Sequence, residues 1–236
     1  MWSYSSSSAS EVQSHPTAGT VMNYPMSGPS RMRRQCLKVI LGLSVPMLGF
    51  SQTVPLDSLP TALRAGGYVI VMRHASSPRT PPDAALVNAD NTQGERQLDE
   101  VGRKTAQDMG EALRRLGIPI GEVLSSPTYR ALETVRLARL GDAKPRPELG
   151  DSGASMQSQS DGKRGAWLRA RSAESPQPGR NTVIVTHAPN ISEAFPDLGA
   201  GLADGEALVL HPNGRADAPL VARVKIEEWK SMRIAP

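Results

Sequence analysis

Two histidines each follow directly after an apolar run. His74 ends the stretch YVIVMRH, which starts at Tyr68, and His187 ends the stretch TVIVTH, which starts at Thr182. Short continuous apolar runs of this kind predict strands buried on both faces of a sheet. Because ligands bind outside the carboxyl ends of strands in open parallel sheets, we expect both imidazoles at one edge. An imidazole there can act as a nucleophile or carry a proton.

Two arginines belong to the same predicted edge. Arg73 precedes His74, and Arg130 lies in the first turn of the helix that follows the predicted strand Glu122–Ser125. Burying such a cluster without an anionic partner is costly. A guanidinium fork matches phosphate oxygens well, so the residue types predict a site for a phosphoryl group.

Three segments resemble the signatures of the histidine phosphatase superfamily, which includes the cofactor-dependent phosphoglycerate mutases. The first, Arg-His-Gly in the family, stands here as Arg73-His74-Ala75, with alanine in place of the usual glycine. The second, Ser-Ser-Pro followed by Arg-Ala and a Thr, begins at Ser125 and reaches Thr134. The third is the apolar strand that ends at His187. The resemblance covers residues 67–210, and three signatures in the expected order form a specific pattern.

This resemblance implies a mechanism. His74 would attack phosphorus and form a phosphohistidine, while Arg73, Arg130 and His187 would hold the phosphoryl oxygens. Water would then hydrolyse the intermediate, without a metal or another cofactor. The chain has one cysteine and four histidines and lacks the His-x-His and His-Glu-x-x-His spacings of metal sites.

The resemblance also implies an acidic residue that protonates the leaving oxygen. Glu148 is the favoured candidate, and Asp151 and Glu206 stay open. Asn190 is expected to cap the helix after His187, with contact to the phosphate as the alternative.

The order of predicted elements indicates an α/β fold: a three-layer sandwich with a mainly parallel central sheet flanked by helices, and an antiparallel hairpin near the C-terminus. The clearest helix is Leu98–Leu116, with Asp99 as its cap and Gly117 at its end. Its apolar face is expected to hold Thr105, Met109, Ala112, Leu113 and Leu116. The other predicted elements are helices at Leu59–Ala65, Tyr129–Leu140 and Ala166–Ala173, strands at Tyr68–Met72, Glu122–Ser125, Thr182–Thr186, Ala207–Leu210 and Leu220–Ile226, and polar loops at Ala75–Arg96 and Gly150–Gly165.

The first 51 residues differ in composition from the rest. Residues 1–31 are rich in Ser and carry little apolar periodicity, so they are expected to be a disordered or mis-annotated leader, with Met32 as the alternative start. Residues 32–51 have a basic lead and a short apolar run, the layout of a secretory signal peptide. A membrane anchor and a buried helix are the alternatives, and RRQCLK loosely resembles a twin-arginine export signal. Residues 52–236 are then one exported, periplasmic domain.

Charge gives no indication of nucleic-acid binding. Of 27 Lys and Arg and 23 Asp and Glu, residues 1–51 hold four and one, so the remainder holds 23 and 22, a net charge of +1. The single cysteine, Cys36, also lies in residues 1–51, so the expected mature chain has neither a disulfide nor a thiol nucleophile.

The sequence thus predicts an exported, metal-independent phosphatase that acts on a small phosphorylated substrate, without nucleic acid and without stable membrane association after signal removal. No long insertion separates the signatures, which favours an open site and disfavours a phosphomutase. A weak or inactive protein that binds a phosphorylated ligand is the alternative from another class. The substrate and the oligomeric state stay open.

Overall fold

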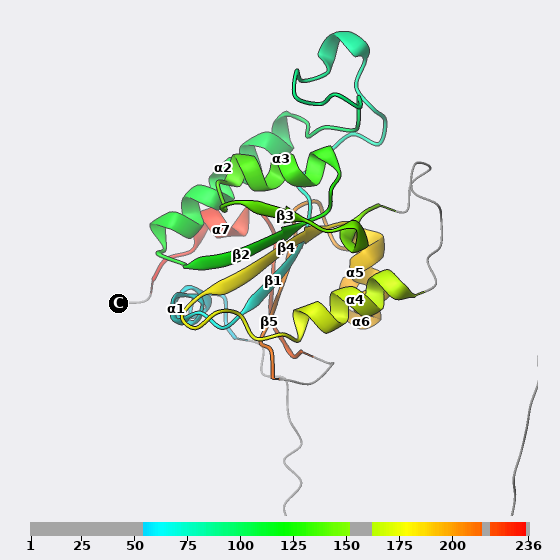
Figure 1. The fold of residues 1–236 in the computed structure, drawn as a ribbon. Helices are drawn as coiled ribbons and strands as arrows, with labels where there is room; N and C mark the ends of the chain where they lie inside the picture. The colour runs from blue at the N-terminus through cyan, green and yellow to red at the C-terminus, as the bar shows by residue number, and fades with distance from the viewer. Residues whose placement is uncertain (1–53, 152–161, 214–217, 235–236) are drawn as a thin grey trace, which may run out of the picture. The chain divides into compact units, whose positions relative to one another are not determined.

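The computed structural model describes residues 54–151, 162–213 and 218–234. A six-stranded sheet runs through this part of the chain in the order β3-β2-β4-β1-β5-β6 (Figure 1). The first four strands in this order are parallel, whereas β5 is antiparallel to both β1 and β6. The strands are β1 (Val69–Arg73), β2 (Ile120–Ser125), β3 (Ala143–Pro145), β4 (Asn181–Thr186), β5 (Ala207–Leu210) and β6 (Leu220–Val224).

Helices cover both faces of the sheet. They are α1 (Leu59–Ala65), α2 (Glu100–Arg115), α3 (Tyr129–Ala138), α4 (Lys163–Ser172), α5 (Ala188–Ala194), α6 (Pro196–Gly199) and α7 (Glu228–Ser231), with single 3-10 turns at Ala84–Leu86 and Pro147–Leu149. The expected three-layer α/β sandwich, with its antiparallel hairpin near the C-terminus, is confirmed.

Side chains on the two faces of the central strands pack in two separate hydrophobic cores. In β1, Ile70 and Met72 pack in the core made with α1, α2, α3 and α7, whereas Val69 and Val71 pack in the core made with α4 and α5. Side chains alternate between the faces of a strand, so a strand covered on both faces must be apolar throughout. This is the physical reason for the continuous apolar runs that precede His74 and His187.

The long helix α2 begins and ends where its capping residues predict. The Asp99 carboxylate accepts a hydrogen bond from the Gly102 N–H at 2.7 Å, and Gly117 takes a positive φ of 64° after the last turn. The predicted apolar face was wrong at Thr105, which is only half-buried and whose hydroxyl donates to the Val101 carbonyl. Ala106, fully buried, takes its place in the core.

Several element boundaries differ from the predicted ones. Helix α4 starts at Lys163 instead of Ala166, and α3 ends at Ala138 because Arg139 adopts the left-handed conformation. Strand β3 and helix α7 were not predicted; both are only three or four residues long. The predicted leader and signal peptide, most of the predicted polar loop Gly150–Gly165 and the turn at Gly214 lie outside the described residues. In the described part of the chain, no helix has the length and apolar character to cross a membrane.

Candidate active site

Strand pairing brings the ends of three parallel strands together. Arg73 at the end of β1 lies opposite Thr186 at the end of β4, so His74 and His187 are the next residues on neighbouring strands. Strand β2 pairs with β4 on its other side, and Ser126 follows its end. The two imidazole centroids are 5.2 Å apart. The structure therefore brings together the two histidines that the sequence pattern singles out.

His74 is buried and held in one tautomer. Its Nδ1 lies 2.8 Å from the Ala75 carbonyl oxygen, which can only accept, so Nδ1 carries the proton. Its Nε2 accepts a hydrogen bond from Arg130 Nε at 3.2 Å. Burial lowers the pKa of His74 to about 4; the bond to Ala75 opposes this shift, and nearby arginines add to it. The imidazole is therefore neutral at ordinary pH, with a lone pair on Nε2.

Arg130 lies at the centre of the cluster. Besides His74, its guanidinium contacts His187 Nδ1, 3.1 Å from Nη2, and forms a short ion pair with Asp151 through the same nitrogen. Only 4% of the residue is exposed. Burial lowers the pKa of Arg130, and the charge of Asp151 opposes that shift. A nearly buried guanidinium thus joins both imidazoles and a carboxylate.

His187 has the opposite tautomer. Its Nδ1 faces Arg130, which can only donate, so the proton lies on Nε2 and is donated to Ser126 Oγ at 2.8 Å. Ser126 is fully buried, and its Oγ also accepts from the Thr128 N–H at 3.2 Å. Burial and the charge of Arg130 lower the pKa of His187 to about 2. Sequence reasoning assigned no role to Ser126, although its place at the end of β2 was a usable signal.

Arg73 joins the cluster from the end of β1. Its Nη1 donates to the Leu202 carbonyl oxygen at 2.9 Å, and its Nη2 lies 2.5 Å from Asp204 Oδ1. Asp204 comes from the loop before β5, and the next residue, Gly205, donates its N–H to the His74 carbonyl oxygen at 2.9 Å. No sequence signal pointed to Asp204, because its contact depends on the return of a distant loop.

The first two signatures are tied together by a threonine. The Ala75 N–H donates to Thr134 Oγ1 at 3.1 Å, and Thr134 donates to the Arg130 carbonyl oxygen at 2.8 Å. Ala75 is fully buried. A small side chain therefore suits this position, and the alanine preserves the local contacts.

The three carboxylates considered as proton donors have different surroundings. Glu206 is bound by Arg223 and by the Ala203 N–H at 2.8 Å. Burial raises the pKa of Glu206, but the hydrogen bonds from Arg223 and Ala203 and the nearby positive charges together outweigh it, and the net shift is downward. This makes Glu206 unsuited as an acid. Asp151 touches the cluster through Arg130, whereas the Oε2 of Glu148 is buried and accepts no hydrogen bond within the described residues.

Asn190 does not cap the helix after His187, as the sequence suggested. Helix α5 starts directly after His187, which occupies the N-cap position. The Asn190 amide is buried and donates to the carbonyl oxygens of Leu149 and Gly150 at 3.1 and 2.9 Å. It therefore holds the segment that carries Glu148 and Asp151 against β4.

Arg96 is a further cation of this region that sequence reasoning left within a polar loop. Its guanidinium donates to the carbonyl oxygens of Ser77 and Pro78 at 3.2 and 2.5 Å. After the larger effect of burial, its charge adds to the lowering of the pKa of both His74 and His187. The usable signal was its position three residues before Asp99, the N-cap of α2.

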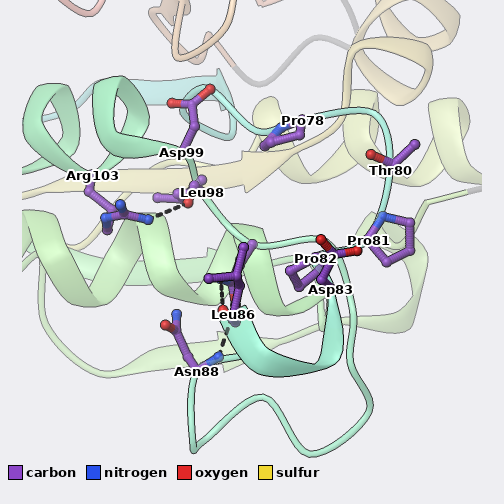
Figure 2. Close-up of a pocket in the computed structure, with 11 residues that line it drawn as sticks. Pro78, Thr80, Pro81, Pro82, Asp83, Leu86, Asn88, Leu98, Asp99 and Arg103 are labelled. Carbon is purple, nitrogen blue, oxygen red and sulfur yellow. Dashed lines mark hydrogen bonds between the residues drawn. The ribbon is translucent and has the colours of Figure 1, made fainter.

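A cavity of about 500 Å³ lies beside this region (Figure 2). The proline-rich loop 78–83 forms one side, and Leu98 and Arg103 form the other. Its wall at Pro78 is bonded to Arg96, but none of the four predicted site residues lines it. The cavity is therefore a separate hollow next to the cluster.

No group of three or more His, Cys, Asp or Glu side chains is arranged as a metal-ligand set within residues 54–151, 162–213 and 218–234.

Comparisons with known proteins agree with the motifs on a limited part of the chain. Residues 69–150 match the model of the histidine phosphatase superfamily (branch 1). No curated protein is significantly similar to the chain. Among solved structures, the protein histidine phosphatase SixA in complex with tungstate is 18% identical, with a TM-score of 0.49, over 68% of this chain and 98% of its own. The ecdysone phosphate phosphatase of Bombix mori is 16% identical, with a TM-score of 0.46, over 66% and 92%.

These identities and TM-scores are low, so the assignment depends on the family match. That match spans β1 with Arg73 and His74, and α3 with Arg130. The third signature, His187, lies beyond it and is placed in the same cluster by the fold. Over residues 69–150, about a third of the chain, the match supports the histidine phosphatase superfamily.

Proposed function

We propose that the protein is a phosphomonoester hydrolase that forms a phosphohistidine at His74 Nε2. One observation carries this proposal: a buried, neutral imidazole presents its Nε2 lone pair to a guanidinium that also touches His187. A neutral imidazole is the nucleophilic form. The match of residues 69–150 to the superfamily supports phosphatase activity.

The reaction proceeds in two displacements. In the first, His74 Nε2 attacks phosphorus, the bond from phosphorus to the leaving oxygen breaks, and an acid protonates that oxygen. In the second, water attacks phosphorus, the P–N bond breaks, and the water proton passes to the same carboxylate. Because Arg130 donates to Nε2, the incoming phosphoryl group has to take over that guanidinium and release the lone pair.

Arg73 and Arg130 hold the phosphoryl oxygens in this proposal, and His187 positions Arg130, because its unprotonated Nδ1 accepts from that guanidinium. Arg73 and Arg130 supply fixed positive charge, and His187 lies against Arg130 at 3.1 Å. Fixed donors aimed at developing charge stabilise a transition state because they need no reorganisation. We propose that these groups replace a metal ion, and that the substrate is a small phosphorylated molecule.

Glu148 is proposed as the proton donor. Asp151 is ion-paired with Arg130, so its carboxylate already contacts a residue proposed to bind phosphate. Glu148 has no ion pair among the described residues, and its segment is held next to His187 by the Asn190 amide and by Thr186, which donates to the Leu149 carbonyl oxygen at 2.9 Å.

The decisive experiment measures hydrolysis of 4-nitrophenyl phosphate by the full chain after treatment with a chelator. We expect turnover in the native protein, loss of at least a thousandfold in His74→Ala, and native turnover in His211→Ala, because His211 is exposed and outside the cluster. Samples stopped by denaturation in alkali should carry an alkali-stable, acid-labile phosphohistidine. Turnover retained in His74→Ala would rule out this nucleophile, and turnover lost on chelation would rule out the metal-free mechanism.

The donor is tested by the leaving group. Glu148→Gln should slow an alkyl phosphate, whose leaving oxygen needs a proton, by about a hundredfold or more. It should slow 4-nitrophenyl phosphate far less, because nitrophenolate leaves unprotonated. Equal losses with both substrates would exclude Glu148 as the acid.

Export is proposed on the basis of residues 32–51 alone. The mass of the mature protein after expression with an intact export system tests it, since cleavage near residue 51 is expected.

A further inference from the structure

Each of the two arginines that are proposed to bind phosphate contacts a carboxylate. Asp204 lies 2.5 Å from Arg73, and Asp151 is paired with Arg130. Asp204 comes from the loop before β5, and Asp151 follows the turn after β3. In the sheet order, β3 and β5 lie on opposite sides of the three strands that carry the cluster, so the carboxylates reach it from two directions.

The Asp151 carboxylate is closer to solvent than the guanidinium it contacts, and the side chains of Asp204 and Arg73 are about equally exposed. The side chain of Arg130 is 5% exposed and that of Asp151 is 32% exposed, while the values for Arg73 and Asp204 are 27% and 36%. A phosphoryl group that reaches the guanidiniums therefore passes beside the carboxylates. In an in-line displacement the leaving group lies opposite His74, toward this outer layer.

The charges of the region balance before any substrate binds. Arg73, Arg96 and Arg130 supply three positive charges, and both imidazoles are neutral. Three negative charges balance them, those of Asp151, Asp204 and Glu95. The Glu95 carboxylate accepts a hydrogen bond from the Tyr129 N–H at the start of α3, at 3.1 Å. The phosphoryl dianion already makes the site negative, so a second anion on the substrate meets no unmatched positive charge.

We propose that Asp151 and Asp204 are specificity determinants, and that the substrate is a phosphomonoester whose leaving group carries no negative charge. This inference rests on the proposed function. At a separation of several Å in a partly solvated site, repulsion by one carboxylate is worth roughly three- to tenfold in affinity. Bisphosphates, phosphorylated carboxylic acids and nucleoside diphosphates are therefore poor ligands, and neutral or cationic phosphomonoesters are good ones.

The test compares two phosphonates that cannot be hydrolysed, 4-carboxybenzylphosphonate and its methyl ester, by calorimetry on the full chain. The native protein should bind the uncharged ester about tenfold or more tightly than the carboxylate. Asp151→Asn and Asp204→Asn should each reduce this ratio about threefold, and raising the salt from 50 to 500 mM should also reduce it. Asp108→Asn is the matched control, because Asp108 pairs with Lys104 and Lys230 on another surface and should leave the ratio unchanged.

The outcomes separate this inference from the proposed function. Equal affinity for both phosphonates in the native protein, or an unchanged ratio in both aspartate variants, overturns the inference. Hydrolysis of 4-nitrophenyl phosphate, measured on the same samples, tests the proposed function alone. If the protein prefers the ester phosphonate but hydrolyses no phosphate ester, the result supports selection against charged leaving groups and contradicts the proposed phosphatase activity. Failure to bind either phosphonate contradicts both.

Discussion

At the scale of single residues, hydrogen-bond partners set the protonation of the two central histidines. His74 donates from Nδ1 to a carbonyl oxygen, and His187 donates from Nε2 to the Ser126 hydroxyl. The nitrogen that each ring leaves unprotonated points at Arg130. One guanidinium and two acceptors thus define which nitrogen of His74 can attack and which nitrogen of His187 carries the proton.

Ser126 is expected to position His187. Replacing it with alanine leaves the Nε2–H of His187 buried with its main acceptor removed, a loss of about 1–3 kcal/mol. We therefore expect Ser126→Ala to lower kcat/KM for 4-nitrophenyl phosphate by about tenfold or more. Ser125→Ala is the matched control, since its hydroxyl is equally buried but, among the described residues, donates only to the Ser126 carbonyl oxygen. Equal losses in the two variants, with equal losses of stability, would reduce Ser126 to a structural role.

The low pKa of His74 predicts activity at acidic pH. Because the ring is neutral down to about pH 4, kcat/KM, corrected for the titration of the substrate, should stay nearly constant from pH 7 to pH 5. A histidine with the ordinary pKa of 6.5 would be about 97% protonated at pH 5. The measurement is a pH profile of kcat/KM, and an acid limb near pH 6.5 would contradict the buried, neutral nucleophile.

At the scale of elements, the position of α3 depends on glycine in α2. A Cβ added to Gly110 would lie 1.8 Å from the Ala138 carbonyl oxygen, and one added to Gly102 would lie 2.1 Å from the Ser76 carbonyl oxygen. Glycine inside a helix costs about 1 kcal/mol in conformational entropy. The missing side chain of Gly110 lets α2 pack directly against α3, whose first turn carries Arg130.

Gly110→Ala should therefore destabilise the protein although alanine favours helices. We expect a loss of about 1–3 kcal/mol in the free energy of unfolding, because α3 must move away from α2. Urea unfolding gives the value, and Glu111→Ala on the exposed side of the same helix is the control. A more stable Gly110→Ala variant would show that the two helices can separate without cost.

At the scale of the whole molecule, the two buried histidines couple stability to pH. In the unfolded chain they titrate near pH 6.5, and in the fold near 4 and 2. The unfolded state therefore binds more protons over this range, so stability is fully present above pH 6.5 and falls as the pH is lowered. From pH 7 to pH 5 each histidine accounts for a loss of about 2 kcal/mol.

Unfolding in urea at pH 7 and pH 5 measures this coupling. His187→Gln should show a smaller decline between the two pH values than the native protein, by about 2 kcal/mol. The exposed His211→Gln is the control and should keep the native decline. The same decline in His187→Gln as in the native protein would mean that other groups dominate acid sensitivity.

The sequence by itself determined the sheet class, the two cores and the convergence of Arg73, His74, Arg130 and His187. Apolar runs covered on both faces, the Asp99 cap and the Gly117 stop are local signals whose physics does not depend on distant partners. Polar residues directly after such runs must lie at the carboxyl edge of a parallel sheet. Local sequence patterns failed at Thr105, whose hydroxyl donates to a carbonyl of its own helix, and did not predict an element as short as β3.

Only the tertiary structure decided the tautomers of the two rings and the partners of the arginines. Asp204 is 131 residues from Arg73 in the chain and Asp151 is 21 residues from Arg130, and neither pairing leaves a periodic trace in the sequence. The same holds for Asn190, whose amide bonds the segment around Leu149 instead of capping its own helix. These contacts depend on the order of the strands in the sheet and on the path of the loops between them. The spacing of residues in the sequence does not encode either.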